Sequence, residues 1–336
     1  MGKIATAKVE LSAAISLTER TRALLDGSIV PAGVSWRVTR VHPSEMFWRQ
    51  LKFEEFDVSE MSVSSLLIMA ASGQRNWVAL PVFPERVFSH TLAQVRAGAG
   101  IGEPAQLAGK RVGVPEYQQT SAVWSRGILQ HEFGVDLRSI EWFMERTPER
   151  SHGGSTGFEP PPGIKLTYIP PEQNIGTMLA GGALDATLLY ISDRNLVDRS
   201  RADVGSGSGI VPLFADPEAE GHRYFAKTGI LPFNSCVVVR RTVYERHPWI
   251  ALNLFNALVA AKERALGGAV ATIEPYFTAG LLAPEDREAL RGDPFPYGVK
   301  ASLPALRFFP RLLHEQGLTK RIVDVEEIFA KQALDL

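Results

Sequence analysis

The feature that most constrains this chain is a unit in which a short strand, a polar turn and a helix follow one another. In the segment Gly109–Val135, residues 111–114 are predicted to form the strand, 115–119 the turn, and Thr120 and Ser121 open the helix. Ligands of open α/β sheets bind beyond the carboxyl ends of strands, and helix N-termini favour anions. An ordinary capped βα loop is the simpler interpretation. The functional one places the polar side chains of this turn in a ligand cleft: Glu116, Tyr117, Gln118 and Thr120.

The same order of elements recurs three more times along the chain. Strands are expected at 13–17, 56–61 and 185–190, each followed by a polar turn and a helical segment. The turn after the last strand, residues 191–194, is expected to lead into the next helix. Four such joints predict an α/β protein whose binding cleft is assembled from several strand ends.

Composition limits the partners of the chain. Its 336 residues are enough for two medium domains, and 36 basic residues balance 37 acidic ones. This balance argues against a nucleic-acid or anionic-membrane partner but permits a locally basic pocket. The only cysteine, Cys236, excludes an internal disulfide and lies in an apolar segment typical of a buried strand, so we expect a core thiol.

The chain shows no signature of export or membrane insertion. No apolar run approaches the length of a membrane span, and Lys8 and Glu10 interrupt the first residues, where a secretory leader needs a continuous apolar region. We therefore expect a cytoplasmic protein.

Two extended segments divide the chain. The first, 78–95, contains Pro81 and Pro84, and the second is 227–241. Because proline disfavours a central strand, the first segment is interpreted as a crossover between lobes. The second is interpreted as a second crossover that leads into a strand. The predicted architecture is two α/β lobes, 1–92 plus 226–336 and 93–225, joined by a double hinge with a cleft between them.

Familiar catalytic and cofactor motifs are absent from the sequence. It has no phosphate-binding loop, no nucleophile elbow and no HExxH, and its seven histidines lack metal-ligand spacing, so no metal or cofactor is expected. Arg20 and Arg22 could bind carboxylates bidentately, although surface arginines are an equally good interpretation. His90 ends the first crossover, where it could face the cleft or could simply pack in the hinge.

Several of these segments together resemble one enzyme family. TERTRALLDGSIVPAG, FDVSEMSVSSL, PVFPERVFSHT, GKRVGVPEYQQTSAVWSRGIL and KTGILPFNSCVVVRR are similar to 4,5-dihydroxyphthalate decarboxylase and its relatives, and the likeness runs from about Arg20 to Glu327. The resemblance implies a type II periplasmic-binding-protein fold in an intracellular enzyme without an organic cofactor.

The resemblance also implies site residues. The positions carried over for substrate binding are Arg20, Arg22, Glu60, Ser62, Ser64, Arg86, Gln118, Thr120 and Lys227. Those carried over for catalysis are His90, Glu116 and Tyr117. The sequence departs from the family pattern at Thr18, Glu19, Ser89 and Gln119, which puts the exact substrate in doubt.

The implied reaction is the non-oxidative decarboxylation of a hydroxylated aromatic carboxylate, 4,5-dihydroxyphthalate or a close analogue. His90 or Glu116 would protonate the ring carbon, Tyr117 or Glu60 would assist at the phenol, and at least two of Arg20, Arg22 and Arg86 would face the cleft. Alternatives are a carboxylate-binding protein or sensor without catalysis, or a dehydratase-type enzyme of the same fold. The expected partner is a small aromatic carboxylate, with a homo-oligomer as a further possibility.

Overall fold

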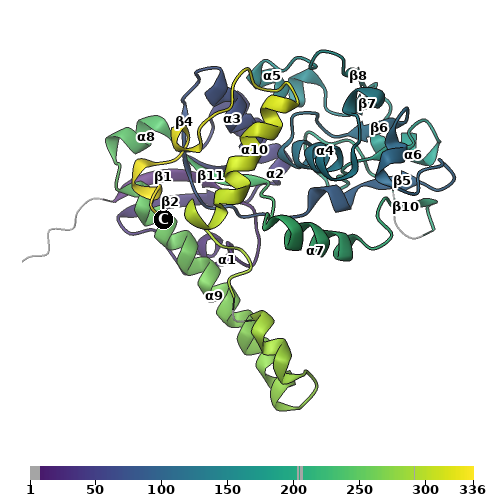
Figure 1. The fold of residues 1–336 in the computed structure, drawn as a ribbon. Helices are drawn as coiled ribbons and strands as arrows, with labels where there is room; N and C mark the ends of the chain where they lie inside the picture. The colour runs from purple at the N-terminus through teal and green to yellow at the C-terminus, as the bar shows by residue number, and fades with distance from the viewer. Residues whose placement is uncertain (1–7, 203, 205–206, 291) are drawn as a thin grey trace, which may run out of the picture.

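The computed structural model describes residues 8–202, 204, 207–290 and 292–336, which form two mixed β-sheets with helices packed around them (Figure 1). The first sheet has the spatial order β2 (Val34–Thr39), β1 (Val9–Ala14), β3 (Val58–Ser62), β11 (Ser235–Arg240) and β4 (Trp77–Leu80). The second has the order β10 (Ile210–Pro212), β5 (Gln94–Arg96), β9 (Ala186–Thr187), β6 (Arg111–Val114), β7 (Glu141–Met144) and β8 (Lys165–Tyr168).

The helices connect these strands and cover the sheets. The α-helices are α1 (Arg22–Leu25), α2 (Pro43–Phe53), α3 (Val63–Ala71), α4 (Thr120–Phe133), α5 (Gly153–Thr156), α6 (Ile175–Ala180), α7 (Pro217–Thr228), α8 (Arg241–Arg246), α9 (Ile250–Thr278) and α10 (Leu303–Glu315). Short 3₁₀ helices are η1 (Ser89–Leu92), η2 (Pro104–Leu107), η3 (Leu137–Ser139), η4 (Pro148–Arg150), η5 (Pro284–Leu290), η6 (Lys300–Ser302), η7 (Val325–Glu327) and η8 (Lys331–Ala333).

Strand direction brings the connecting turns together. In the first sheet β1 runs parallel to β2 and β3. In the second sheet β6 runs parallel to β7 and β9. Because parallel strands end at the same edge of their sheet, the turns after β1, β2 and β3 lie together, as do those after β6, β7 and β9. These two sets of turns supply most of the candidate site described below.

The chain crosses between the sheets twice, as the two-lobed fold with a double hinge requires. The strands of the first sheet come from residues before 81 and after 234, and those of the second from 94–212. The two crossing segments pair with each other: Val87 N–H donates to Pro232 O at 3.1 Å, and Asn234 N–H to Glu85 O at 3.1 Å. The lobe boundaries at 92 and 225 stay a prediction.

One of the four expected strand–turn–helix joints is wrong in its details. The strand expected at 185–190 is reduced to Ala186–Thr187, and the turn 191–194 does not lead into a helix, because β10 comes before the next helix, α7. Backbone donors beyond the strand are taken by side chains: Val197 and Asp198 N–H donate to Asn195 Oδ1. Such local bonds compete with helix formation and keep this segment irregular.

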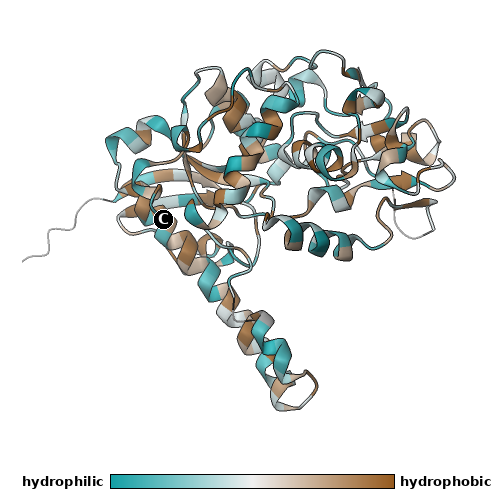
Figure 2. Cartoon of the chain, viewed as in Figure 1, coloured by the Kyte–Doolittle hydropathy of each residue, from teal (hydrophilic) through white to brown (hydrophobic). Residues whose placement is uncertain are grey.

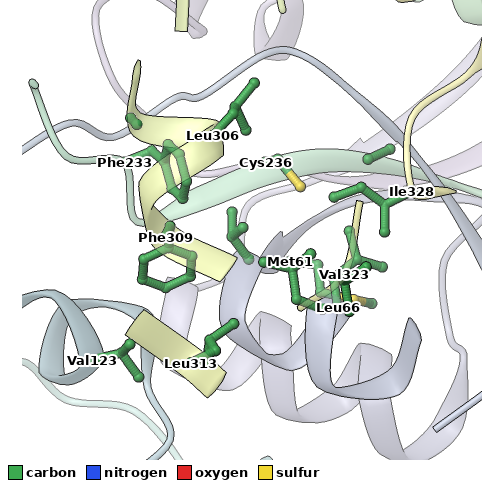
Figure 3. Close-up of a cluster of buried hydrophobic side chains, with 14 of the residues drawn as sticks. Met61, Leu66, Val123, Phe233, Cys236, Leu306, Phe309, Leu313, Val323 and Ile328 are labelled. Carbon is green, nitrogen blue, oxygen red and sulfur yellow. The ribbon is translucent and has the colours of Figure 1, made fainter. Parts of the chain in front are cut away.

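A large hydrophobic core extends across the hinge (Figure 3). It joins Phe233 and Cys236, beside the second crossing segment, to Phe309 of α10 and Val123 of α4. A Cβ at Gly127 of α4 would lie 2.5 Å from Leu312 Cδ1 of α10, so α4 and α10 approach closely there and a side chain would require Leu312 to shift. The prediction of a core thiol is confirmed, because Cys236 is fully buried in β11 and burial raises its pKa.

Helix α9 is only partly packed against the first sheet. Its buried residues lie between Ile250 and Lys262, and the remainder projects away from the body as an arm (Figure 1). Within the described residues no helix is long and apolar enough to cross a membrane. Part of the N-terminal segment on which the export prediction rests, residues 1–7, lies outside the described residues.

Candidate functional site

A cavity of about 830 Å³ lies where the turns of the two sheets meet. The first sheet contributes the turn after β1, the turn between β2 and α2, and Glu60 of β3. The second contributes the start of α4, Arg146 after β7, and residues 189–194 after β9. The crossing segments close one side with Glu85, Val87 and Asn234. This is the inter-lobe cleft expected at the strand ends.

Glu60 is a buried carboxyl in the wall of this cavity, with an exposed fraction of 1%. Its Oε1 accepts a hydrogen bond from Ser16 N–H at 2.8 Å, and its Oε2 accepts one from the Ser235 hydroxyl at 2.8 Å. Burial raises the pKa of Glu60, and this effect outweighs the two hydrogen bonds that act in the opposite direction. Glu60 can therefore hold a proton above the pH at which an exposed glutamate loses it.

Arg20 is the one carried-over arginine that lines the cavity. Its Nη2 donates to Pro84 O at 2.5 Å and its guanidinium lies 4.0 Å from the Phe295 ring centroid. Its Nε has no hydrogen-bond partner among the described residues. The guanidinium is thus fixed in direction while keeping donor capacity for a carboxylate.

The prediction that at least two of Arg20, Arg22 and Arg86 face the cleft is wrong. Arg22 is exposed and pairs with Glu19 three residues earlier, because it begins the short helix α1 whereas Arg20 lies in the turn before it. Arg86 donates to Leu231 O at 2.9 Å and Pro296 O at 3.0 Å, on the other face of its extended segment.

Sequence reasoning missed His42 and Arg40, which follow β2 and line the cavity. His42 caps α2: its Nδ1 accepts from Ser44 N–H at 3.3 Å, and its Nε2 lies 4.0 Å from Asp193 Oδ2. The signal was available, because the His42–Pro43 pair stands between a strand and a helix beside the Arg20 turn. The Nδ1 acceptor role leaves the ring hydrogen on Nε2.

Arg146 also lines the cavity and is held by two buried carboxylates. Its Nε and Nη2 donate to Asp198 at 2.7 and 3.1 Å, and its Nη1 donates to Glu116 Oε2 at 3.1 Å. Burial alone would lower the pKa of Arg146, but Asp198 and Glu116 raise it. Nearby His152 is buried too, which lowers its pKa to about 4 and keeps it neutral.

Glu116 itself does not line the cavity. Its second oxygen accepts from Gly153 N–H at 2.9 Å, so both oxygens are engaged behind the wall that Arg146 forms. The structure assigns Glu116 the position of a support for Arg146 and separates it from any ligand in the cavity. The expectation that it projects into the cleft is corrected accordingly.

A cluster of buried hydroxyls ties the two lobes together instead of lining the cavity. Thr120 Oγ1 lies 2.9 Å from Ser62 Oγ and accepts from Ser64 N–H at 3.1 Å, and the Ser64 hydroxyl donates to Gln118 O at 2.5 Å. Ser62 ends β3 whereas Thr120 begins α4, so these bonds join the first sheet to the second lobe. The carried-over Ser62, Ser64, Gln118 and Thr120 contribute to lobe geometry.

Tyr117 is also absent from the cavity. Its ring is fully buried against Trp142 and lies 3.7 Å from the Arg126 guanidinium. Burial raises the pKa of its hydroxyl, which makes a proton transfer by Tyr117 less favourable.

His90 is fully buried away from the cavity, contrary to the expectation that it meets the ligand from the hinge. Its Nε2 lies 3.0 Å from Glu220 Oε1 of α7, and its ring packs among Phe88, Phe214 and Tyr224. Burial lowers the pKa of His90.

Lys227, which was expected to bind substrate, also lies outside the inter-lobe cavity. It is exposed on α7 and its Nζ pairs with Glu132 at 2.9 Å.

Two polar residues at the start of α4 complete the cavity wall. Gln119 and Ser121 line it, and Gln119 Oε1 and Ser121 Oγ have no hydrogen-bond partner among the described residues. They stand at the N-terminus of a 14-residue helix, where anions are favoured. Gln119 is one of the departures from the family pattern, so a departure falls directly on the cavity. Among the described residues no group of three or more His, Cys, Asp or Glu side chains could hold a metal ion.

Comparison with solved structures supports the fold. The aliphatic sulphonate binding protein SsuA from Escherichia coli covers 98% of this chain and 99% of its own, with a TM-score of 0.53 and 13% identity. The desulfurization enzyme DszB covers 98% of both chains, with a TM-score of 0.53 and 14% identity. At these identities the likeness shows a shared fold, which serves a binding protein in one case and an enzyme in the other.

Comparison of sequences is more specific. No family model matches the chain. A 4,5-dihydroxyphthalate decarboxylase from Comamonas testosteroni is 31% identical over 331 residues, 98% of both chains. One from Pseudomonas putida is 34% identical over 181 residues, which are 54% of this chain and 70% of the relative. The chain therefore belongs to the 4,5-dihydroxyphthalate decarboxylase family.

Proposed function

We propose that the inter-lobe cavity binds a hydroxylated phthalate-type carboxylate and releases one carboxyl group as CO2, converting 4,5-dihydroxyphthalate or a close analogue to protocatechuate or its counterpart. The observation that carries this proposal is the combination of arginines with Glu60, a buried carboxyl of raised pKa, in one cavity wall. Arginines bind carboxylates, and a protonated carboxyl can supply the hydrogen that replaces CO2.

Binding is assigned to the basic side of the cavity. Arg20, Arg40 and Arg194 line it together with the N-terminus of α4. Strong binding of the departing carboxylate would stabilise the ground state and slow the reaction. We therefore assign the firm contact to the carboxylate that stays on the ring, with Arg20 as its partner.

The chemistry follows from the substrate and Glu60. Each hydroxyl of 4,5-dihydroxyphthalate is para to one carboxylate, so transfer of its proton to water, which later returns one, pushes electrons toward the carbon that bears the departing group. Glu60 donates a proton to that carbon and gives a dienone-like intermediate. The carbon–carboxyl bond then breaks, its electron pair returns to the ring, CO2 leaves, and the phenol oxygen regains a proton. His42 Nε2–H is placed to donate a hydrogen bond to a substrate oxygen.

A CO2-release assay over hydroxylated benzoates and phthalates tests the proposed function. We expect turnover of substrates with a hydroxyl para to a carboxylate, and none of phthalate, which lacks the electron source. Tight binding without CO2 release across the panel would favour a carboxylate-binding protein or sensor. Loss of water from a different acid would favour a dehydratase-type enzyme.

The expected homo-oligomer is supported by the arm of α9, defined as residues 265–284. This stretch contains a single charged residue, Glu274. Val270, Tyr276 and Leu281 on it are 41, 53 and 72% exposed, and its hydropathy alternates along the projecting helix (Figure 2). Arg287 of η5 pairs with Glu274 at 2.6 Å, so the exposed apolar side chains of the arm suit a second copy of this chain better than an anionic surface. Light scattering tests this proposal. We expect particles of the Leu281→Glu variant to be smaller than those of the parent protein. The cytoplasmic location stays a prediction.

A further inference from the structure

A second cavity of about 520 Å³ lies on the opposite face of the hinge. Along the extended first crossing segment Glu85 and Val87 line the inter-lobe cavity, whereas Arg86 and Phe88 line this one. Side chains of an extended chain alternate between two faces, which explains the division. We call this second cavity the outer hinge groove.

The groove is bounded by parts of both lobes. Helix α7 contributes His222 and Phe225, and the second crossing segment contributes Leu231. The opposite wall comes from the loop at 293–296 and the start of α10. A molecule bound here would contact α7, α10 and both crossing segments at once.

Arg86 is the buried charged residue of the groove, with an exposed fraction of 9%. It donates to Leu231 O, Pro296 O and the Ser302 hydroxyl, all uncharged acceptors. Its Nε is buried and has no partner among the described residues. Asp293 borders the groove, but its carboxylate pairs with Lys262. A buried guanidinium without a counterion is costly, and burial lowers the pKa of Arg86 to about 10.

We propose that the outer hinge groove binds a small aromatic monocarboxylate, with its carboxylate on Arg86 and its ring against Phe88, Phe225 and Leu231. The apolar lining suits a ring, and the single unpaired cation suits one carboxylate. The groove thereby differs from the inter-lobe cavity, whose several arginines suit a diacid.

Binding of a ligand in the outer hinge groove affects movement at the hinge. Because the ligand touches elements of both lobes, it restrains their relative movement and changes the KM of the inter-lobe site without touching the substrate. The site itself does not depend on which reaction the inter-lobe cavity performs.

Calorimetry with benzoate as the probe tests the proposal, with phthalate present at saturating concentration to occupy the inter-lobe cavity. We expect benzoate to bind at one site, and its neutral isostere benzamide to bind at least about tenfold more weakly. Ala301→Trp fills the groove and Phe225→Glu adds a repelling charge, so each should weaken benzoate binding at least about tenfold. Ala219→Trp, on an exposed part of α7 outside both cavities, is the matched control and should stay within about twofold.

Three outcomes would overturn the proposal: equal binding of benzamide and benzoate, unchanged binding in both groove variants, or complete displacement of benzoate by phthalate. Phe225 is 47% exposed, so its variant reports on the groove even if Ala301→Trp fails to fold.

Discussion

Replacement of Glu60 by glutamine separates its proposed chemistry from its structural contacts. The amide introduced by Glu60→Gln can still accept from Ser16 N–H through its oxygen and donate to the Ser235 hydroxyl through its nitrogen, since both partners lie 2.8 Å from the native carboxylate oxygens. We expect the free energy of unfolding to change by about 1 kcal/mol or less. Glu60→Ala would leave both buried partners unsatisfied, and at about 1–3 kcal/mol for each group it should cost about 2–6 kcal/mol.

The loss of the acid should appear in turnover. Removal of a general acid typically costs about 10²–10⁴-fold in rate, so kcat of Glu60→Gln for CO2 release should fall by that amount. Substrate affinity should stay within about threefold, because the arginines that hold the carboxylate are unchanged. Glu85→Gln removes a second carboxylate from the same cavity, one whose charge helps to raise the pKa of Glu60, so it should keep most of the activity at low pH while that pKa falls.

The pH dependence gives a second test of Glu60. An acid whose pKa is raised by folding contributes stability that is present below its ordinary pKa and lost as pH rises through the raised value. Wild-type stability relative to Glu60→Gln should therefore decline as pH rises above about 4.5, and wild-type kcat should fall through the same raised pKa. A Glu60→Gln enzyme with normal kcat and folding would refute the proposed role.

Three further predictions concern the other carried-over residues. Arg20→Ala should weaken substrate binding by about 1.5–3 kcal/mol, whereas its exposed neighbour variant Arg22→Ala should not, as Kd measurements would show. His90→Gln should keep kcat within about threefold but abolish a decline in wild-type stability as pH falls below about 6.5, because burial lowers the pKa of His90 and its protonation opposes folding. Thr120→Val leaves buried Ser64 N–H unpaired and should lower the free energy of unfolding by about 1–3 kcal/mol in denaturant titrations.

The fold could be predicted from the sequence because its signals are local. The strand at Arg111–Val114 and the helix opened by Thr120 appear where the polar turn between them indicates. The prolines of the crossing segments lie after β4 and before β11, in the stretches that pair with each other outside the two sheets. The prediction of a helix after β9 was wrong because two side chains accept hydrogen bonds from backbone N–H groups of this segment: Glu145, which is distant in sequence, and Asn195, which is local.

The site was harder to predict because the direction in which each side chain points determines whether it lines the cavity. Family positions identify neighbourhoods, but Arg86 and Val87 point to opposite faces of one extended segment, and only the second reaches the inter-lobe cavity. His90 and Glu116 were chosen for their chemistry, yet both are engaged with partners that lie far along the chain, Glu220 and Arg146. Those long-range pairs leave no pattern in the sequence around either residue.

The central claim is that the inter-lobe cavity, with Arg20 and Glu60 in its wall, is where the aromatic carboxylate reacts. A crystal structure of the protein with phthalate, which binds but lacks the hydroxyls that drive decarboxylation, tests it most directly. We predict phthalate in this cavity, one carboxylate on Arg20 and the ring carbon of the other facing the Glu60 carboxyl. Phthalate bound beside His90 or Lys227, with the inter-lobe cavity empty, would contradict the claim.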